Sequence, residues 1–155
     1  MPARFSAALL AYRTGDQGPE VFLVHMGGPY WAHKDEGAWS IPKGEYDPTA
    51  ESAQQVAARE FAEEVGLAAP AGPWRDLGEH RLPSGKRVRT FAVRTDADLA
   101  FVSSNLFTME WPPRSGRVGE FPETDGAQWF ELDVARRKLV SGQVPILDRL
   151  ADAVR

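Results

Sequence analysis

The chain has 155 residues, a formal net charge of −4 and no cysteine. This length suits one hydrophobic core, so we expect a single domain over residues 1–155. The lack of cysteine excludes disulfides and thiolate metal sites, and the negative charge disfavours a general nucleic-acid binder. No apolar run approaches the ~20 residues of a membrane span, and no signal-peptide core precedes residue 10. We therefore expect a cytoplasmic protein.

The first forty residues predict a hairpin followed by an irregular stretch. Residues 5–12 and 21–25 are apolar runs of strand length, separated by a turn-forming loop at residues 14–19. Residues 39–41 predict a short strand before Pro42.

One long helix is predicted next. Asp47 is a good N-cap and Pro48 suits the first helical position, while Gly66 is the residue type that most often ends a helix. Its apolar stripe at helical spacing comprises Ala50, Ala53, Ala57, Phe61 and Val65.

The second half of the chain alternates strand-length and helix-length segments. Strands are predicted at residues 76–82, 87–94, 107–111 and 127–130. Pro112 and Pro113 end the third strand and start a loop that runs to Asp125. Helices are predicted at residues 134–140, capped by Asp133, and at residues 145–154. Strands interleaved with helices predict a mixed α/β sandwich.

Three carboxylates lie on one side of the predicted long helix. Glu60, Glu63 and Glu64 stand at spacings of three and four residues, so their side chains are neighbours. They repel one another unless a cation lies among them, and oxygen ligands without histidine or cysteine suit Mg²⁺ or Mn²⁺. An acidic helix face is usually only solvated, but the preceding glycine loop and the Arg-Glu pair favour a metal site here.

The same segment reads Gly44, six residues, Glu51, seven residues, and then Arg-Glu-Phe-Ala-Glu-Glu-Val-Gly-Leu up to Leu67. This segment resembles the Nudix box of the Nudix (MutT-like) hydrolases. Every fixed position from Glu51 to Leu67 matches, and the departure is six residues instead of five after Gly44. One extra loop residue costs little closure entropy. Residues 39–44 and Trp129-Phe130 also look like strands of this family, and the chain is most similar to its small stand-alone bacterial members.

The resemblance implies an α/β/α sandwich with a mixed sheet and Mg²⁺-dependent hydrolysis of a pyrophosphate bond, with Mn²⁺ as an alternative ion. The substrate would be a nucleoside diphosphate derivative: a dinucleoside polyphosphate, ADP-ribose or another sugar nucleotide, or a nucleoside triphosphate. The implied metal ligands and catalytic residues are Glu60, Glu63, Glu64 and, through its backbone carbonyl, Lys43. Structural roles in the box are implied for Gly44, Glu51, Arg59 and Gly66.

Further candidates come from residue type and loop position. Cations that suit phosphate are Lys43, Arg81, Arg87, Arg89 and Arg114. Aromatic residues that could stack on a base are Tyr30, Trp31 and Trp111. Extra acids for a metal or a base are Glu110, Glu120 and Glu123. Each group also has an ordinary reading, because surface arginines are common and loop aromatics often pin loops to the core.

Two other functions remain open at this stage. One is a nucleotide-sensing module without turnover, although such modules usually lose the box carboxylates that this chain keeps. The other is an RNA 5′-end pyrophosphohydrolase, which the acidic balance disfavours. The expected partner is a small nucleotide, and the resemblance also allows a homodimer.

Overall fold

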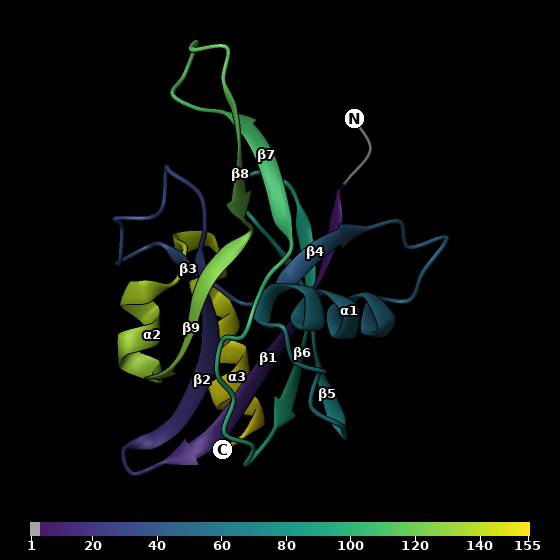
Figure 1. The fold of residues 1–155 in the computed structure, drawn as a ribbon. Helices are drawn as coiled ribbons and strands as arrows, with labels where there is room; N and C mark the ends of the chain where they lie inside the picture. The colour runs from purple at the N-terminus through teal and green to yellow at the C-terminus, as the bar shows by residue number, and fades with distance from the viewer. Residues whose placement is uncertain (1–3) are drawn as a thin grey trace.

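The computed structural model describes residues 4–155, in which a seven-stranded mixed sheet carries helices on both faces (Figure 1). The strands of this sheet are β1 (Phe5–Gly15), β2 (Gly18–Met26), β3 (Trp39–Ser40), β4 (Lys43–Tyr46), β5 (Trp74–Arg81), β6 (Arg87–Arg94) and β9 (Thr124–Glu131). The helices are α1 (Ala53–Val65), α2 (Leu132–Lys138), the short 3₁₀ turn η1 (Ser141–Gln143) and α3 (Val144–Ala153). The predicted α/β/α sandwich is confirmed.

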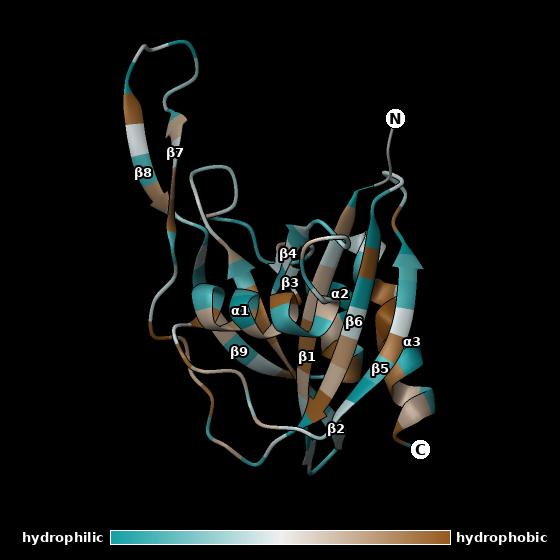
Figure 2. Ribbon diagram, turned by 90° about the vertical axis from the view of Figure 1, so that its right-hand side faces the viewer, coloured by the Kyte–Doolittle hydropathy of each residue, from teal (hydrophilic) through white to brown (hydrophobic). Residues whose placement is uncertain are grey.

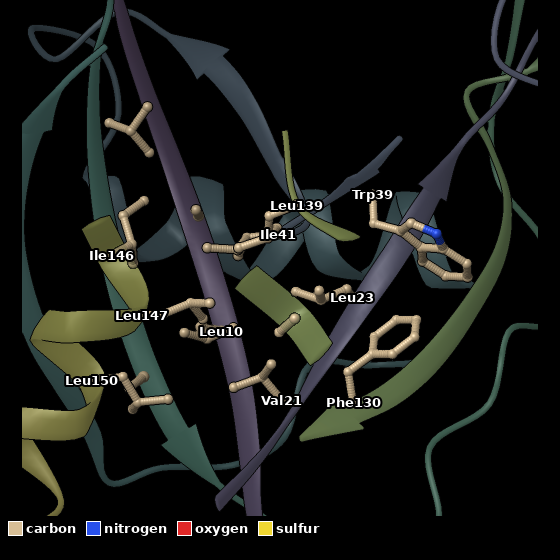
Figure 3. Close-up of a cluster of buried hydrophobic side chains, with 14 of the residues drawn as sticks. Leu10, Val21, Leu23, Trp39, Ile41, Phe130, Leu139, Ile146, Leu147 and Leu150 are labelled. Atoms are coloured by element: carbon tan, nitrogen blue, oxygen red, sulfur yellow. The ribbon is translucent and has the colours of Figure 1, made fainter. Parts of the chain in front are cut away.

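Strand β1 lies at the centre of the sheet, parallel to β6 and antiparallel to β2. Because successive strand residues point to opposite faces, Ala7 and Leu9 join the core beneath α1, while Ala8 and Leu10 join the core beneath α2 and α3. Figure 3 shows side chains from β1, β2, β9 and α3 meeting in this second core. The edge strand β5 is mostly polar (Figure 2).

The two strands of the first hairpin diverge after their shared turn. The paired residues of β1 and β2 are Tyr12–Gly15 and Gly18–Val21, whereas the first residues of β1 pair with β4. The far end of β2 pairs instead with β3 and β9. Strands β3 and β4 therefore fill a fork between β1 and β2, and the Leu9 N–H donates to the Pro42 carbonyl across it (3.1 Å).

A second, two-stranded sheet projects from the body (Figures 1 and 2). It consists of β7 (Leu106–Glu110) and β8 (Val118–Pro122). The sequence predicted β7 but assigned β8 to a long loop, and that assignment is wrong. Gly119 and Glu120 interrupt the apolar pattern of β8, so the strand depends on pairing with β7 and on contact between the Phe107 and Phe121 rings, whose centroids lie 6.0 Å apart.

The long helix begins later than predicted. Ser52 is its N-cap and forms a capping box with Gln55, in which each side chain accepts from the other residue's backbone N–H. Asp47 instead closes a preceding turn by accepting from the Thr49 N–H (2.9 Å). The predicted end is correct, since Gly66 adopts the left-handed C-cap conformation with φ 86°.

Other differences concern short elements. The predicted loop at residues 14–19 is a two-residue turn, because the strands continue to Gly15 and from Gly18. An ion pair between Arg13 and Glu20 (2.7 Å) joins the extended strands. Strand β4 was not predicted, and α2 begins at Leu132 rather than after an Asp133 cap. Among residues 4–155, no helix is long and apolar enough to cross a membrane.

Gly66→Ala should destabilise the protein more than Gly37→Ala. Both glycines have positive φ, which costs other residues about 1–2 kcal/mol, but a Cβ at Gly66 would also lie 2.6 Å from the Ser103 nitrogen, whereas nothing lies within 4 Å of one at Gly37. Urea denaturation of both variants measures the free energy of unfolding. Equal losses would contradict close packing of the Ser103 loop on the helix end.

Candidate active site

Four carboxylates from two separate segments line one cavity of about 350 Å³. Glu60, Glu63 and Glu64 come from the last turns of α1, and Glu123 comes from the junction of β8 and β9. The complete lining, called the acidic cavity below, is Lys43, Gly44, Glu45, Glu60, Glu63, Glu64, Asn105 and Glu123. The structure thus brings the predicted glutamates of the helix together with one of the three extra acids.

Gly44 allows β4 to lie directly against the Glu60 carboxyl group. A Cβ at this position would lie 2.1 Å from Glu60 Cδ, so any larger residue would displace the carboxylate. The extra residue between Gly44 and Glu51 does not disturb this contact, because the turn that begins at Asp47 lies between β4 and α1. The departure from the Nudix pattern is therefore accommodated outside the cavity.

Glu64 and Glu60 are held in an environment that favours their protonated forms. Burial raises the pKa of Glu64 to about 8, although its Oε2 accepts the Lys43 N–H (3.2 Å), which opposes the shift. Burial and the neighbouring Glu63 carboxylate raise the pKa of Glu60 to about 6. Glu123 adds to both shifts, which shows that its charge reaches the helix carboxylates. A divalent cation would offset this repulsion.

Arg59 organises the outer side of the carboxylate cluster. It forms an ion pair with Glu51, and it lies 3.9 Å from Glu60 and 3.8 Å from Glu63. These partly exposed pairs contribute little stability individually. Their effect is to limit the orientations that the Glu60 and Glu63 side chains can adopt, as the sequence analysis expected for a structural residue.

The end of α1 is fixed to the segment that carries Glu123. The Asn105 N–H donates to the Glu63 carbonyl (3.2 Å), and the Asn105 carbonyl accepts from the Glu123 N–H (2.8 Å). The Thr124 hydroxyl donates to the Glu64 carbonyl. Asn105 was missed by sequence reasoning, because its place in the cavity depends on these backbone contacts and on the unpredicted strand β8.

Of the predicted cations, only Lys43 lines the acidic cavity among the described residues. Burial, and then the nearby Lys86 ammonium group, lower the pKa of Lys43. Arg87 pairs with Glu79 (3.3 Å) and Arg89 pairs with Asp76 (2.9 Å), both between β5 and β6. Arg81 is exposed on β5, outside this cavity.

The remaining candidates are divided between the hairpin and a neighbouring cavity. Tyr30 and Trp31 line that cavity, while Trp111 packs edge-on against Tyr30 with centroids 5.0 Å apart. Glu110 accepts from the Arg114 backbone N–H (2.7 Å) at the far end of the hairpin. The structure therefore places Trp111, Arg114, Glu110 and Glu120 away from the acidic cavity.

The residues of the acidic cavity fit a hard divalent cation. Within residues 4–155, no three acidic or histidine side chains are already arranged as a metal centre. The donor set is nevertheless of the right chemistry, because four carboxylates and no sulfur or imidazole line the cavity. The raised pKa values of Glu60 and Glu64 further indicate that these buried carboxylates lack a compensating cation.

Comparison with known proteins places the chain in a family. The sequence profile of the NUDIX domain matches residues 3–150, and the chain therefore belongs to the Nudix family. The activity of this class is pyrophosphohydrolysis, and Nudix hydrolases generally need divalent metal ions. No curated protein sequence gives a significant match.

Solved structures share the fold at low sequence identity. The NUDIX domain of Shewanella oneidensis NrtR, crystallised with ADP ribose, is 15% identical with a TM-score of 0.69, over 100% of this chain and 90% of that chain. A C. elegans Ap4A hydrolase is 19% identical with a TM-score of 0.62, over 96% and 97% of the two chains. A mutT/nudix family protein from Listeria innocua is 18% identical with a TM-score of 0.59, over 99% and 95%.

Millimolar Mg²⁺ should raise the melting temperature of the wild-type protein by several degrees. Binding to the folded state alone stabilises it by about 2.7 kcal/mol when the ion is at 100 times its Kd. Differential scanning fluorimetry should show this increase in Glu131→Gln, which removes a carboxylate at the start of α2, but not in Glu64→Gln. An equal increase in both variants would locate the ion elsewhere.

Proposed function

We propose that this protein catalyses the Mg²⁺-dependent hydrolysis of a pyrophosphate bond in a nucleoside diphosphate derivative. The observation that carries the proposal is the acidic cavity, in which three glutamates of the Nudix-box helix meet Glu123 and Lys43. Family membership supplies the class of reaction. Mg²⁺ is the proposed ion because the donors are hard oxygens.

Each residue has a defined part in this scheme. A bound Mg²⁺ ion would neutralise phosphate oxygens and lower the pKa of a water molecule. Glu60 and Glu64 would hold the ion, with Glu64 fixed by the Lys43 N–H and Glu60 fixed against Gly44. Glu63 or Glu123 would accept the proton of the attacking water. The Lys43 carbonyl is a further proposed ligand, and its ammonium group would pair with a phosphate.

The reaction requires water to attack one phosphorus atom while the bridging oxygen leaves with the other phosphate. Positioning and electrostatics dominate such a step, because the protein contributes little covalent chemistry. The backbone contacts that join Glu63 and Glu64 to the Glu123 segment would supply this positioning. The products are two phosphomonoesters.

Related proposals concern the setting of this activity. The packing of both cores on one sheet supports a single domain over residues 1–155. We propose a cytoplasmic location and a small nucleotide rather than a nucleic acid as substrate, since the net charge is −4 and Arg87 and Arg89 are paired with acids. A homodimer remains a proposal that light scattering would test.

Glu64→Gln should lower kcat by about 10²-fold or more, the scale of one preorganised electrostatic group. The assay measures Mg²⁺-dependent phosphate release, with phosphatase coupling, from diadenosine tetraphosphate, ADP-ribose, a sugar nucleotide and several triphosphates. Glu131→Gln should keep wild-type activity, and EDTA should abolish it. Near wild-type turnover by Glu64→Gln would sink the assignment.

Glu123→Gln should lower kcat by about 10²-fold, within the range of a general base, with a small change in KM. Glu120→Gln is the matched control, because Glu120 lies three residues earlier on the exposed hairpin and outside the cavity. Steady-state kinetics of the two variants with the same substrate separate these roles. Equal losses in both would mean that Glu123 acts only through the general charge of this segment.

A further inference from the structure

Two more cavities, each of about 350 Å³, adjoin the acidic cavity at the fork between β1 and β2. One shares Glu123 with the acidic cavity, and the other shares Lys43 with it. The two additional cavities also share Met26, the last residue of β2. The three cavities therefore form one continuous site, with the carboxylates next to two compartments of different chemistry.

The compartment beyond Glu123, called the aromatic cavity, lies between residues 27–31 and strand β7. Its lining is Met26, Gly27, Gly28, Pro29, Tyr30, Trp31, Phe107, Met109 and Glu123. The Gly27 N–H donates to the Glu123 carbonyl (3.0 Å), and a Cβ at Gly28 would lie 2.8 Å from Phe107 Cζ. No basic side chain appears in this described lining, so the cavity suits a flat uncharged ring rather than a phosphate.

The compartment beyond Lys43, called the hydroxyl cavity, contains no aromatic ring among its described residues. Its lining is Met26, Ser40, Lys43, Leu82, Pro83, Ser84, Val140, Ser141, Gly142 and Gln143. Gln143 donates to Ser40 Oγ (3.0 Å) and accepts from the Ile41 N–H (2.9 Å), so this pair mainly shapes the wall. Ser84 and Ser141 add hydroxyl groups at the rim, which suit a ligand that carries hydroxyls.

Lys43 marks the boundary between the carboxylates and the hydroxyl cavity. Among residues 4–155 it forms no ion pair with a carboxylate, although it lines both compartments. A partly buried ammonium group in this position favours a phosphate oxygen as its partner. The order of chemical preferences along the site is therefore aromatic ring, diphosphate with metal, phosphate contact to Lys43, and hydroxyl-bearing group.

We propose that the substrate is a nucleoside diphosphate whose second phosphate carries a hydroxyl-rich group such as a sugar. The base occupies the aromatic cavity and the sugar occupies the hydroxyl cavity. This inference rests on the proposed function and selects among its substrate classes. A nucleoside triphosphate would leave the hydroxyl cavity unused, and a dinucleoside polyphosphate would place its second base where no aromatic side chain lies.

The test is steady-state kinetics with ADP-ribose, ATP and diadenosine tetraphosphate in the presence of Mg²⁺. Water cleaves the bond between the two phosphates of ADP-ribose to give AMP and ribose phosphate, which phosphatase coupling detects. Wild-type kcat/KM should be at least about tenfold higher for ADP-ribose than for the other two. Ser84→Trp, which fills the hydroxyl cavity, and Met109→Trp, which fills the aromatic cavity, should each raise KM at least about tenfold with little change in kcat.

Each variant has a matched control. Ser115 accepts the backbone N–H two residues later, as Ser84 does, but lies in the loop between β7 and β8. Thr108 precedes Met109 and points to the opposite face of β7. Ser115→Trp and Thr108→Trp should keep the wild-type KM, and thermal melting should show that all four variants are folded.

Calorimetric titration of ADP-ribose into the Glu64→Gln and Ser84→Trp/Glu64→Gln proteins separates the two proposals. Higher activity on ATP or diadenosine tetraphosphate, or an unchanged KM in Ser84→Trp, overturns the substrate assignment while hydrolysis stands. Binding of ADP-ribose that Ser84→Trp weakens, with no wild-type turnover of any substrate, overturns hydrolysis and supports the cavities. Absence of both binding and turnover overturns both.

Discussion

The contact between β4 and the carboxylate face of α1 determines the geometry of the whole site. Gly44 lets the strand touch the Glu60 carboxyl group, and the adjacent Lys43 N–H donates to Glu64. Two otherwise repelling side chains are thereby fixed by one short strand, which is itself paired with the buried central strand β1. Buried carboxylates without cations are unfavourable, so this arrangement sacrifices stability for a preformed metal-binding geometry.

The fork in the sheet explains why the three cavities adjoin. Because β1 and β2 separate, the end of β2 presents Met26 between the aromatic and hydroxyl cavities, and β4 inserts Lys43 beside it. A continuous sheet would bury these backbone groups in ladder hydrogen bonds. In this fold the separated strands are paired by β3, β4 and β9, so the fork opens a binding site without leaving strand edges unpaired.

The sequence predicted most strands, the end of α1 and the carboxylate cluster, because apolar periodicity and the Gly66 cap are local signals. It failed where tertiary contacts decide. The start of α1 depended on a choice between two plausible caps, and the Ser52–Gln55 capping box satisfies backbone groups at both residues, whereas Asp47 serves a turn. Strand β8 carries little apolar pattern of its own and requires its partner β7.

The site shows the same division between local and assembled features. The box glutamates follow one another on a single helix, so their spacing alone indicates metal chemistry. The two flanking cavities take residues from the end of β2, the β5–β6 turn, η1, the loop after β2 and the hairpin, segments that only the fold brings together. Reaction chemistry was therefore readable from contiguous residues, while substrate selection depends on contacts between segments up to about a hundred residues apart, as the Gln143–Ser40 hydrogen bond illustrates.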